Sequence, residues 1–391
     1  MLISEKLAQT SIHPINLEVD HAEGLYIYTP CGKRYMDMIS GIGVSALGHG
    51  NSRIKEAIKQ QIDKYMHVMV YGEFGQVSQN MAAELLTDML PDSLDQVYFV
   101  NSGAEANEAA LKLAKRVTGR TKIFAFRGAY HGSTHGALSV SGNEKKKYAF
   151  RPLLPDVHFL NLGDHDQLEL VDNQCAAVIL ETIQGDAGVR APSKEYMRQL
   201  RQKCDETGAL LILDEIQCGL GRSGTDFAFE LFGIEPDILT LGKSLGGGMP
   251  LGAVVAAKEK MSKLTYDPEL GHITTFGGHP VIAASVAAFL EEYHRLISLS
   301  DVNEKGKRIA EKLGSHHRVI EIRQHGLFFA IDMGSAEDVN RVVEHCLDNG
   351  LISFWFLSCP SAFRIAPPLN ISDEEIEKAC EIILNAFNSL D

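Results

Sequence analysis

Lys243 has a setting in the chain that points to covalent chemistry. It follows an apolar stretch, residues 238–242, and precedes a run of glycines that ends at Gly248. A second apolar stretch, residues 209–213, leads into Asp214. An amine and an acid at the ends of two buried strands favour Schiff-base chemistry, in which the lysine forms an imine with a carbonyl compound. Pyridoxal phosphate is a carbonyl cofactor that takes an acid beside its pyridinium nitrogen, so we predict that it binds here.

A possible phosphate site lies in the segment 101–107, which joins a predicted strand to a predicted helix. Ser102 and Gly103 at a helix start leave backbone N–H groups free, and the helix dipole favours an anion there. The same residues also fit a plain N-cap by Ser102, which is the more common use of serine at such a position.

Three further segments place polar or aromatic residues after predicted strands. Tyr130 could stack on a planar ring, or it could be a surface loop tyrosine. The segment from Glu181 to Gly188 fits a site wall or ordinary turn chemistry. Gln217 could donate to a phenolate oxygen, and Ile216 could press on a ring face.

Gly219, Gly221 and Gly224 match the dinucleotide-binding pattern G-x-G-x-x-G. Polar residues separate them from the preceding strand, and the sequence after Gly224 begins a helix poorly. An oxidoreductase that uses NAD through this motif is therefore the less favoured alternative.

The elements that would position these residues alternate along the chain. Short apolar runs predict strands at 97–100, 122–126, 176–180, 210–213, 238–241 and 253–256. Helices are expected at 104–118 and from Ser193, as N-cap, to Gly208, as C-terminal stop. This alternation predicts an α/β fold with a mainly parallel sheet and helices on both faces.

The sequence predicts a separate segment at the start of the chain and a small domain at its end. Residues 24–28 and 33–38 fit a hairpin, and we assign residues 1–45 to an N-terminal segment that packs with the small domain. A large domain is expected at 46–289. Residues 290–391 are assigned to a small α+β domain, with strands at 319–322, 327–331 and 363–365, a helix near 336–347, and a final helix capped by Ser372 and Glu375.

Bulk composition excludes several classes of protein. The 37 basic residues against 51 acidic ones give a net charge of −14, which argues against nonspecific nucleic-acid binding. The single basic cluster, Lys145 to Lys147, is expected in a solvated loop. No stretch is apolar enough to span a membrane. The seven cysteines form no Cys-x-x-Cys pair, which favours reduced thiols and a cytoplasmic protein. No histidine spacing predicts a metal site.

From about residue 20 to its end, the chain resembles the class III aminotransferases, which include acetylornithine, ornithine and 4-aminobutyrate aminotransferases. The matching segments are 101–107, 214–217 with 219–224, 243–248, 275–278 and 364–369. The resemblance implies fold type I of the pyridoxal phosphate enzymes, with a seven-stranded type of sheet. It also implies a homodimer whose active sites lie at the subunit interface.

The resemblance implies a role for each matching residue. Lys243 would carry the internal aldimine, and Asp214 would pair with the pyridine nitrogen. The other residues expected at the cofactor are Ser102, Gly103 and Ala104 at the phosphate, Tyr130 and Ile216 on the ring faces, Gln217 at the ring hydroxyl, Glu181, and Thr275 at the partner subunit's phosphate. Arg364 would bind the carboxylate of glutamate or 2-oxoglutarate, with Asp186 and Glu73 also at the substrate.

Two positions depart from the family pattern. Ser133 stands where acetylornithine and ornithine enzymes usually carry an arginine that holds a donor carboxylate. Asp186 stands where a glutamate commonly pairs with the arginine equivalent to Arg364, and the shorter side chain predicts a weaker pair. We expect an aminotransferase that moves an amino group from an amino acid or ω-amine to 2-oxoglutarate by a ping-pong mechanism. A racemase or decarboxylase with the same cofactor is the closest alternative.

Overall fold

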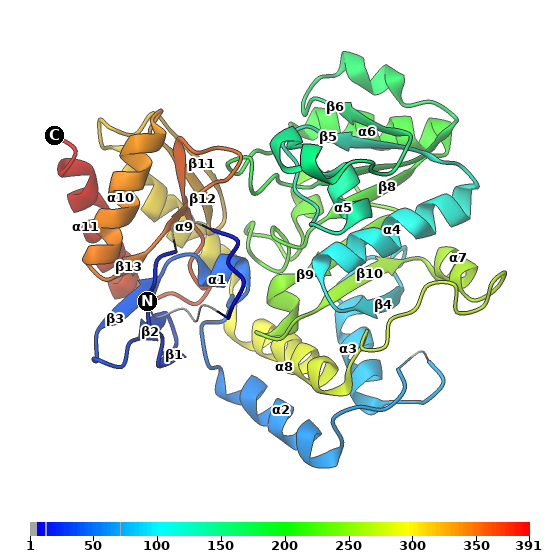
Figure 1. Cartoon of the computed structure of the whole chain (residues 1–391), viewed down its shortest axis with the longest axis horizontal. Coiled ribbons are helices and arrows are strands. Elements are labelled where there is room, and N and C mark those ends of the chain that lie inside the picture. Colours follow the sequence, from blue (N-terminus) through cyan, green and yellow to red (C-terminus); the bar gives the residue numbers. More distant parts are fainter. Residues whose placement is uncertain (1–5, 12–13, 71) are drawn as a thin grey trace.

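The computed structural model describes residues 6–11, 14–70 and 72–391, and its largest sheet has seven strands in the order β4-β10-β9-β8-β7-β5-β6 (Figure 1). Four neighbouring pairs are parallel, from β9 across to β6, and β10 runs antiparallel to both β9 and β4. The predicted mainly parallel sheet is therefore confirmed. Its strands are β4 (Gln96–Val100), β5 (Lys122–Phe126), β6 (Val157–Leu160), β7 (Cys175–Glu181), β8 (Leu210–Asp214), β9 (Ile238–Gly242) and β10 (Gly252–Ala256).

Helices cover both faces of this sheet because its central strands are apolar on both sides. Ala177 and Ile179 of β7 share a core with the alanine-rich face of α4 (Gly103–Thr118). Val178 and Leu180 of the same strand belong to the core that contains the apolar residues of α6 (Lys194–Thr207). Alternate side chains of one strand thus bury two different helices, as a doubly covered sheet requires.

The predicted helix boundaries are also present. Ser102 accepts a hydrogen bond from the Glu105 amide and caps α4. Ser193 caps α6 in the same way, and α6 ends at Gly208 with φ of 69°, a left-handed conformation that glycine adopts without strain. Local sequence therefore fixes the start of α4, directly after β4, and both ends of α6.

The C-terminal sheet is antiparallel, with the order β11-β12-β15-β14, and three helices pack with it. The predicted first strand, 319–322, is partly wrong: the strand begins at Glu321, because pairing starts opposite Asp332. The predicted capping box of Ser372 and Glu375 is confirmed. The elements are α9 (Leu299–Gly314), β11 (Glu321–His325), β12 (Phe328–Asp332), α10 (Ala336–Asp348), β14 (Phe354–Trp355), β15 (Ala362–Ile365) and α11 (Asp373–Asn388).

The described part of the N-terminal segment lies with the C-terminal part of the chain, on the left of Figure 1. The hairpin of β2 (Tyr26–Tyr28) and β3 (Arg34–Asp37) is confirmed, with β1 (His21–Glu23) on its outer edge. β13 (Leu351–Ile352) pairs in parallel with β3. The division at residues 45 and 289 stays a prediction, and α8 (Pro280–Leu296) is continuous across the second boundary.

The basic cluster, Lys145 to Lys147, is only partly solvated, contrary to the loop that the sequence predicted. Lys147 is 3% exposed and donates to the carbonyl groups of Ser139 and Ser141 at 3.1 Å and 3.0 Å.

Three further helices lie below the large sheet in Figure 1. There α2 (Ser52–Lys64) and α3 (Val77–Thr87) pack against α8. Among the residues that the structure describes, no helix has both the length and the apolar character needed to cross a membrane.

Candidate active site

Three polar residues lie side by side where parallel strands of the large sheet end. In the sheet register, Glu181 of β7 is opposite Asp214 of β8, and Asp214 is opposite Thr240 of β9. Lys243 follows the end of β9 directly. Ligands of open α/β sheets bind beyond the carboxyl ends of the strands, so this row marks the edge at which a ligand is expected.

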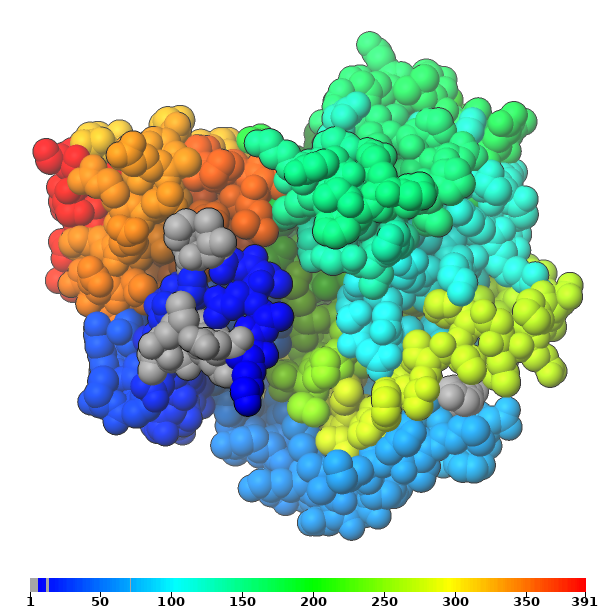
Figure 2. All heavy atoms as spheres, viewed as in Figure 1, coloured from blue at the N-terminus to red at the C-terminus, as the bar shows by residue number. Residues whose placement is uncertain are grey.

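A cavity of about 790 Å³ lies at this edge. The space-filling view shows a hollow there, between the blue N-terminal residues and the residues near 130–150 (Figure 2). Its lining includes most of the residues that the sequence predicted, together with Val44 from the N-terminal segment. The predicted residues in the lining are Ser102, Gly103, Ala104, Tyr130, Glu181, Asp214, Ile216, Gln217 and Lys243.

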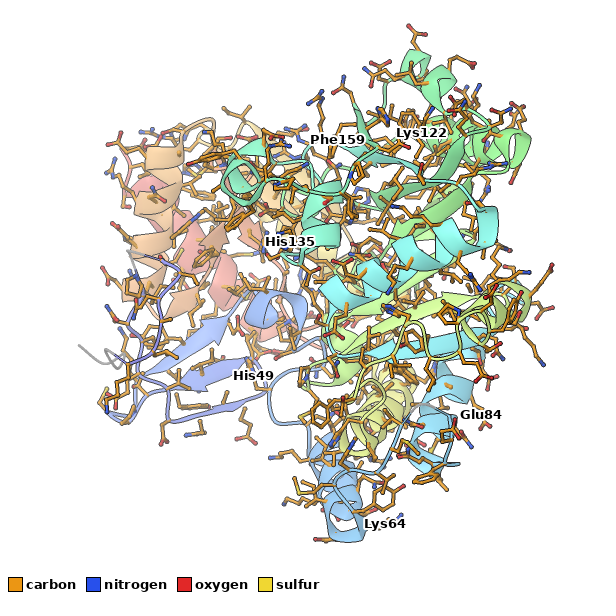
Figure 3. All side chains as sticks on the ribbon, turned by 45° about the vertical axis from the view of Figure 1, so that its right-hand side comes forward. His49, Lys64, Glu84, Lys122, His135 and Phe159 are labelled. Carbon is orange, nitrogen blue, oxygen red and sulfur yellow. The ribbon has the colours of Figure 1, made fainter. Side chains whose placement is uncertain are left out.

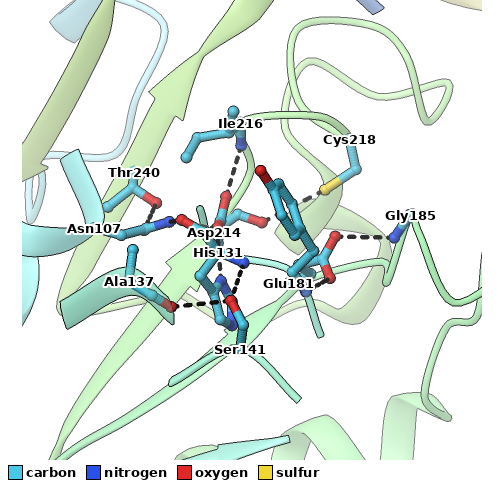
Figure 4. A network of polar contacts seen from close by, with 11 residues as sticks. Asn107, His131, Ala137, Ser141, Glu181, Gly185, Asp214, Ile216, Cys218 and Thr240 are labelled. Carbon is cyan, nitrogen blue, oxygen red and sulfur yellow. Dashed lines mark hydrogen bonds and ion pairs between the residues drawn. The ribbon is translucent and has the colours of Figure 1, made fainter. Parts of the chain in front are cut away.

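Asp214 is held by a network of buried hydrogen bonds (Figure 4). Its Oδ2 atom lies 2.7 Å from His131 Nδ1 and accepts a bond of 2.8 Å from Asn107 Nδ2. Its Oδ1 atom accepts from the Ile216 amide at 3.1 Å. Thr240 donates to Asn107 Oδ1 at 2.9 Å, which fixes the orientation of the amide. A carboxylate held in this way keeps its position without depending on solvent.

Three members of this network, Asn107, His131 and Thr240, were not predicted from the sequence as site residues. Asn107 lies on the face of α4 that is otherwise buried alanine, and a polar residue on such a face was the available signal. His131 gave no comparable signal, because its spacing from the other histidines predicted no metal site. Its Nε2 atom is buried with no partner among the described residues.

Glu181 lies at the other end of the row of polar residues, next to Asp214. Its two oxygens accept hydrogen bonds from the Tyr130 amide at 2.8 Å and the Gly185 amide at 2.9 Å. Burial raises the pKa of Glu181 to about 7, although the nearby His131 opposes this shift. The side chain thus positions the backbone at Tyr130 and supplies a group that titrates near neutral pH.

Lys243 combines burial with an unusual backbone conformation. Its φ is 44°, in the left-handed region that a lysine rarely adopts, and such strain is concentrated at functional sites. Burial lowers the pKa of the Lys243 amine, while Asp214 and Glu181 act in the opposite direction. A lowered pKa increases the fraction of neutral amine, which is the form that attacks a carbonyl.

The donor set and the shape of the cavity fit pyridoxal phosphate. The N-terminus of α4 offers backbone N–H groups at Ser102, Gly103 and Ala104 for a phosphate. At Gly103, an added Cβ would lie 2.8 Å from Ile216 Cδ1, so only glycine leaves this wall of the cavity in place. Asp214 would face the pyridine nitrogen, and Lys243 supplies the amine for the aldehyde.

Arg364 and Asp186 lie near each other, with both side chains largely buried. The Arg364 guanidinium is 3.8 Å from Asp186 Oδ1 and lies over the Phe356 ring, 4.4 Å from its centre. Its Nε atom has no partner among the described residues. Burial lowers the pKa of Arg364. The long contact leaves the guanidinium weakly paired, as the shorter aspartate side chain leads one to expect.

Arg364 and Asp186 are absent from the lining of the cavity around Lys243, and two further predicted residues lie away from it. Thr275 is exposed and is absent from the cavity lining. Glu73 is exposed and lines a different cavity of about 580 Å³, beside α3 and the segment 269–278. Within one chain, neither residue contributes to the site around Lys243.

The glycine motif of the oxidoreductase alternative has a structural use. After Gly224 the chain forms only a short 3₁₀ helix, Ala228–Phe232, and no long helix presents its N-terminus to a phosphate. Arg222, inside the motif, is buried and donates to the carbonyl groups of Leu327 and Pro367. The motif therefore ties the large sheet to the C-terminal sheet.

The chain was compared with known families and solved structures. The family model described as Aminotransferase class-III matches residues 7–387. The acetylornithine aminotransferase of Archaeoglobus fulgidus is 38% identical to this chain over 94% of each. The chain belongs to the class III aminotransferases. The family resemblance that the sequence suggested is thereby confirmed.

Solved structures of aminotransferases have the same fold. An ornithine aminotransferase from Toxoplasma gondii matches with a TM-score of 0.90 and 29% identity, covering 98% of this chain and 92% of that one. An amine transaminase from an uncultivated Pseudomonas species, with pyridoxal phosphate bound, matches with a TM-score of 0.90 and 26% identity over 100% of both chains. Fold type I, the aminotransferase activity and the pyridoxal phosphate cofactor are thus confirmed for this class III enzyme.

Proposed function

We propose that this aminotransferase moves an amino group from an amino acid or ω-amine donor to 2-oxoglutarate by a ping-pong mechanism. The observation that carries the proposal is the placement of Lys243, Asp214 and Glu181 around one cavity at the ends of adjacent strands. When bound, pyridoxal phosphate accepts the amino group of the donor and later releases it to the oxo acid.

Lys243 would move the proton. Its amine, made more often neutral by burial, takes a proton from the donor carbon that bears the amino group and returns it on the cofactor side. Asp214, fixed by His131 and Asn107, would pair with the pyridine nitrogen and hold a proton on it. Tyr130, Ile216 and the N-terminus of α4 would orient the ring and the phosphate.

Arg364 would bind the carboxylate of the oxo acid. A guanidinium binds a carboxylate through two parallel hydrogen bonds, and Arg364 keeps an unpaired Nε atom for that purpose. The contact between Arg364 and Asp186 is long. This supports the view that Arg364 can bind substrate without first breaking a strong ion pair with Asp186.

We further propose that the enzyme acts as a homodimer. The segments 66–81 and 270–279 expose several large apolar side chains, which on a single chain would face water. They include Met66, Phe74, Val77, Leu270, Ile273 and Phe276. The two segments adjoin, because Gln79 donates to the Gly278 carbonyl. Thr275 and Glu73 lie on these segments. A second copy of the chain would cover the surface and bring these two residues to its active site.

We also propose a cytoplasmic location. All seven cysteines are free, and Cys31 is exposed as a thiol. A protein with this pattern suits a reducing compartment.

Initial-rate kinetics test the reaction. A ping-pong aminotransferase gives parallel double-reciprocal lines for donor and 2-oxoglutarate, and it forms glutamate and the oxo product of the donor in equal amounts. Intersecting lines would contradict the proposed order. Release of carbon dioxide, or inversion of an amino acid without any acceptor, would favour the decarboxylase or the racemase instead.

A further inference from the structure

The segment labelled α1 (Ser40–Gly43) in Figure 1 is a left-handed helical turn. The φ angles of its four residues are 49°, 57°, 69° and 79° in chain order. Two backbone hydrogen bonds close the turn, from the Gly43 amide to the Ile39 carbonyl at 2.9 Å and from the Val44 amide to the Ser40 carbonyl at 2.8 Å. A complete left-handed turn is rare, because the Cβ atom of an L-residue crowds the following carbonyl oxygen there.

The turn carries strain that its own side chains do not offset. Gly41 and Gly43 adopt this backbone conformation freely, but Ser40 and the β-branched Ile42 do not. Ile42 is also 36% exposed, so its burial returns little. Strained backbone persists only where the surrounding structure holds it. The turn must therefore be held by contacts from outside it.

The turn lies against the cofactor cavity. A Cβ atom built on Gly43 would have Lys243 Cδ at 3.8 Å and Gln217 Cγ at 3.9 Å as its nearest neighbours beyond the adjoining residues. Val44, which follows the turn, is part of the cavity lining. The turn thus borders the stem of the lysine that is expected to react.

Asp37 holds the turn from inside the protein. It is 1% exposed, and its Oδ1 atom accepts a hydrogen bond from the Ile39 amide at 3.1 Å. Its Oδ2 atom accepts from the Gly41 amide at 2.9 Å and lies 2.9 Å from His49 Nε2. One buried carboxylate therefore fixes two amides at the start of the turn.

His49, which is labelled in Figure 3, holds Asp37 in turn. When Nε2 carries the proton it donates to Asp37, and Nδ1 then accepts from the Ser45 hydroxyl, 3.3 Å away. The His49 amide donates to the Gly24 carbonyl at 2.7 Å, and the Gly24 amide donates to the His49 carbonyl at 2.9 Å. The imidazole therefore has a defined position and orientation.

The turn is also tied to the strand of Arg364. Ser40 Oγ donates to the Ala366 carbonyl at 2.8 Å, and the Ala366 amide donates to the Met38 carbonyl at 2.7 Å. Ala366 follows β15, the strand that contains Arg364. The turn therefore links the surroundings of Lys243 to the segment that carries the proposed oxo-acid arginine.

We propose that Asp37 and His49 are positioning residues for the transamination. They hold residues 40–43 in the left-handed conformation, and the turn limits the movement of Lys243 and fixes its place relative to Arg364. Asp37 and His49 do not line the cofactor cavity, so they act through the turn. The inference rests on the proposed role of Lys243 in proton transfer, and it does not depend on the identity of the donor.

The test compares two replacements of His49. In His49→Gln the side-chain amide reaches Asp37 as Nε2 does, whereas in His49→Asn it is one methylene too short. Ile42→Gly, alone and combined with His49→Asn, removes the strain at residue 42. His158→Asn is the matched control, because it removes an exposed histidine whose Nε2 lies 3.0 Å from Asp156.

In His49→Asn, kcat should fall roughly ten- to a hundredfold, because a small displacement of the proton-transfer group costs about that much. The kinetic isotope effect with a donor deuterated at the amine-bearing carbon should rise, since proton transfer by Lys243 becomes slower. The Kd of the apoenzyme for pyridoxal phosphate should change little, because the proposed phosphate contacts and Asp214 lie outside the turn. His49→Gln should recover most of the loss, and His158→Asn should behave as wild type.

Hydrogen exchange of the apoenzyme gives a readout that does not depend on activity. His49→Asn should speed the exchange of the Gly41, Gly43 and Val44 amides and leave the amides of β8 unchanged. In the Ile42→Gly background, His49→Asn should have a smaller effect on both exchange and kcat, because glycine adopts the left-handed conformation without strain.

Three outcomes overturn the proposal. One is an unchanged kcat in His49→Asn, and another is a fall in kcat without faster exchange in the turn. The last is exchange that rises equally in β8, together with weaker cofactor binding, which would show a general loss of stability. If the wild-type enzyme formed no glutamate from any donor, the proposed function would fail, while the exchange measurements would still decide whether His49 holds the turn.

Discussion

Glu215 follows Asp214 directly in the chain, yet the two carboxylates lie in different surroundings. Asp214 lines the cofactor cavity. Glu215 accepts hydrogen bonds from the Thr182 hydroxyl and from the amides of Ala228 and Phe229, which fixes the chain after the glycine motif. Burial raises the pKa of Glu215 to about 7, and these hydrogen bonds reduce the shift.

The raised pKa of Glu215 predicts a pH-dependent stability. Between its unfolded pKa, near 4.5, and about 7, the folded protein holds a proton that the unfolded chain has lost. The free energy of unfolding therefore falls as pH rises through this window, by up to about 3 kcal/mol for this group. Denaturant unfolding of the apoenzyme at pH 5 and pH 7.5 should show a smaller fall for Glu215→Gln than for wild type. Equal falls would contradict the assignment, and exposed Glu311→Gln is the control.

Replacing Lys243 by alanine should separate cofactor binding from turnover. Lys243→Ala should lose roughly 10²–10⁴-fold in kcat, because the proton-transfer group is gone. The cofactor should still bind through Asp214 and the N-terminus of α4. After borohydride treatment, intact-mass spectrometry should show an added mass in wild type and none in the variant. Digestion should place that mass on the wild-type peptide that contains Lys243. Near-normal turnover would remove Lys243 from the mechanism.

Arg364→Ala should act mainly on the oxo acid. Removing one partner of a buried charged contact costs about 2–5 kcal/mol, so the KM for 2-oxoglutarate should rise strongly while the KM for a simple amine donor changes little. Steady-state kinetics with both substrates varied measure this. An unchanged KM for 2-oxoglutarate would place its carboxylate elsewhere.

At the scale of elements, the site depends on how closely α4 approaches the turn after β8. Gly103 begins α4, and its missing side chain leaves room for Ile216. The same helix carries Asn107 one turn later, where it reaches Asp214. One helix thus provides the proposed phosphate site and supports the acid, so its distance from the sheet governs both.

Gly103→Ala should weaken cofactor binding. The new Cβ would lie 2.8 Å from Ile216 Cδ1, and such overpacking costs about 1–3 kcal/mol, so the Kd for pyridoxal phosphate should rise roughly tenfold. Adding Ile216→Val removes the nearest crowding atom, Cδ1, but leaves Cγ2 at 3.0 Å, so it should recover part of the loss. Gly246→Ala is the control, because its Cβ would find its nearest neighbour at 3.5 Å. Fluorescence titration of the apoenzymes measures the Kd, and an unchanged value would exclude the steric argument.

At the scale of the whole molecule, the proposed homodimer rests on the apolar surface of segments 66–81 and 270–279. Val77 is 80% exposed and Phe276 is 53% exposed, which is costly for side chains of their size in water. The two segments also carry Glu73 and Thr275, which contribute nothing to the cavity of their own chain. A single surface therefore accounts for the exposed apolar area and for the two misplaced residues.

Val77→Glu should disrupt the proposed homodimer. A charge in the centre of an apolar interface must be desolvated, so the variant should sediment as a single chain in analytical ultracentrifugation and lose most activity. Ile320→Glu, at a position that is 71% exposed on the other lobe, should leave the wild-type mass and activity unchanged. A wild-type protein that is monomeric and fully active would contradict the proposal.

The sequence by itself determined the strands that lead to Glu181, Asp214 and Lys243, and the caps at Ser102, Ser193 and Gly208, because apolar runs and capping residues act over a few neighbours. It did not determine that β10 runs antiparallel, since a uniformly apolar strand has no directional pattern.

Only the tertiary structure brought Asn107, His131 and Thr240 to Asp214 and placed Lys146 beside Asp186, because these contacts join residues from separate elements. Burial then set the pKa of Glu181, Glu215 and Lys243, since the cost of a charge depends on the atoms that replace water around it.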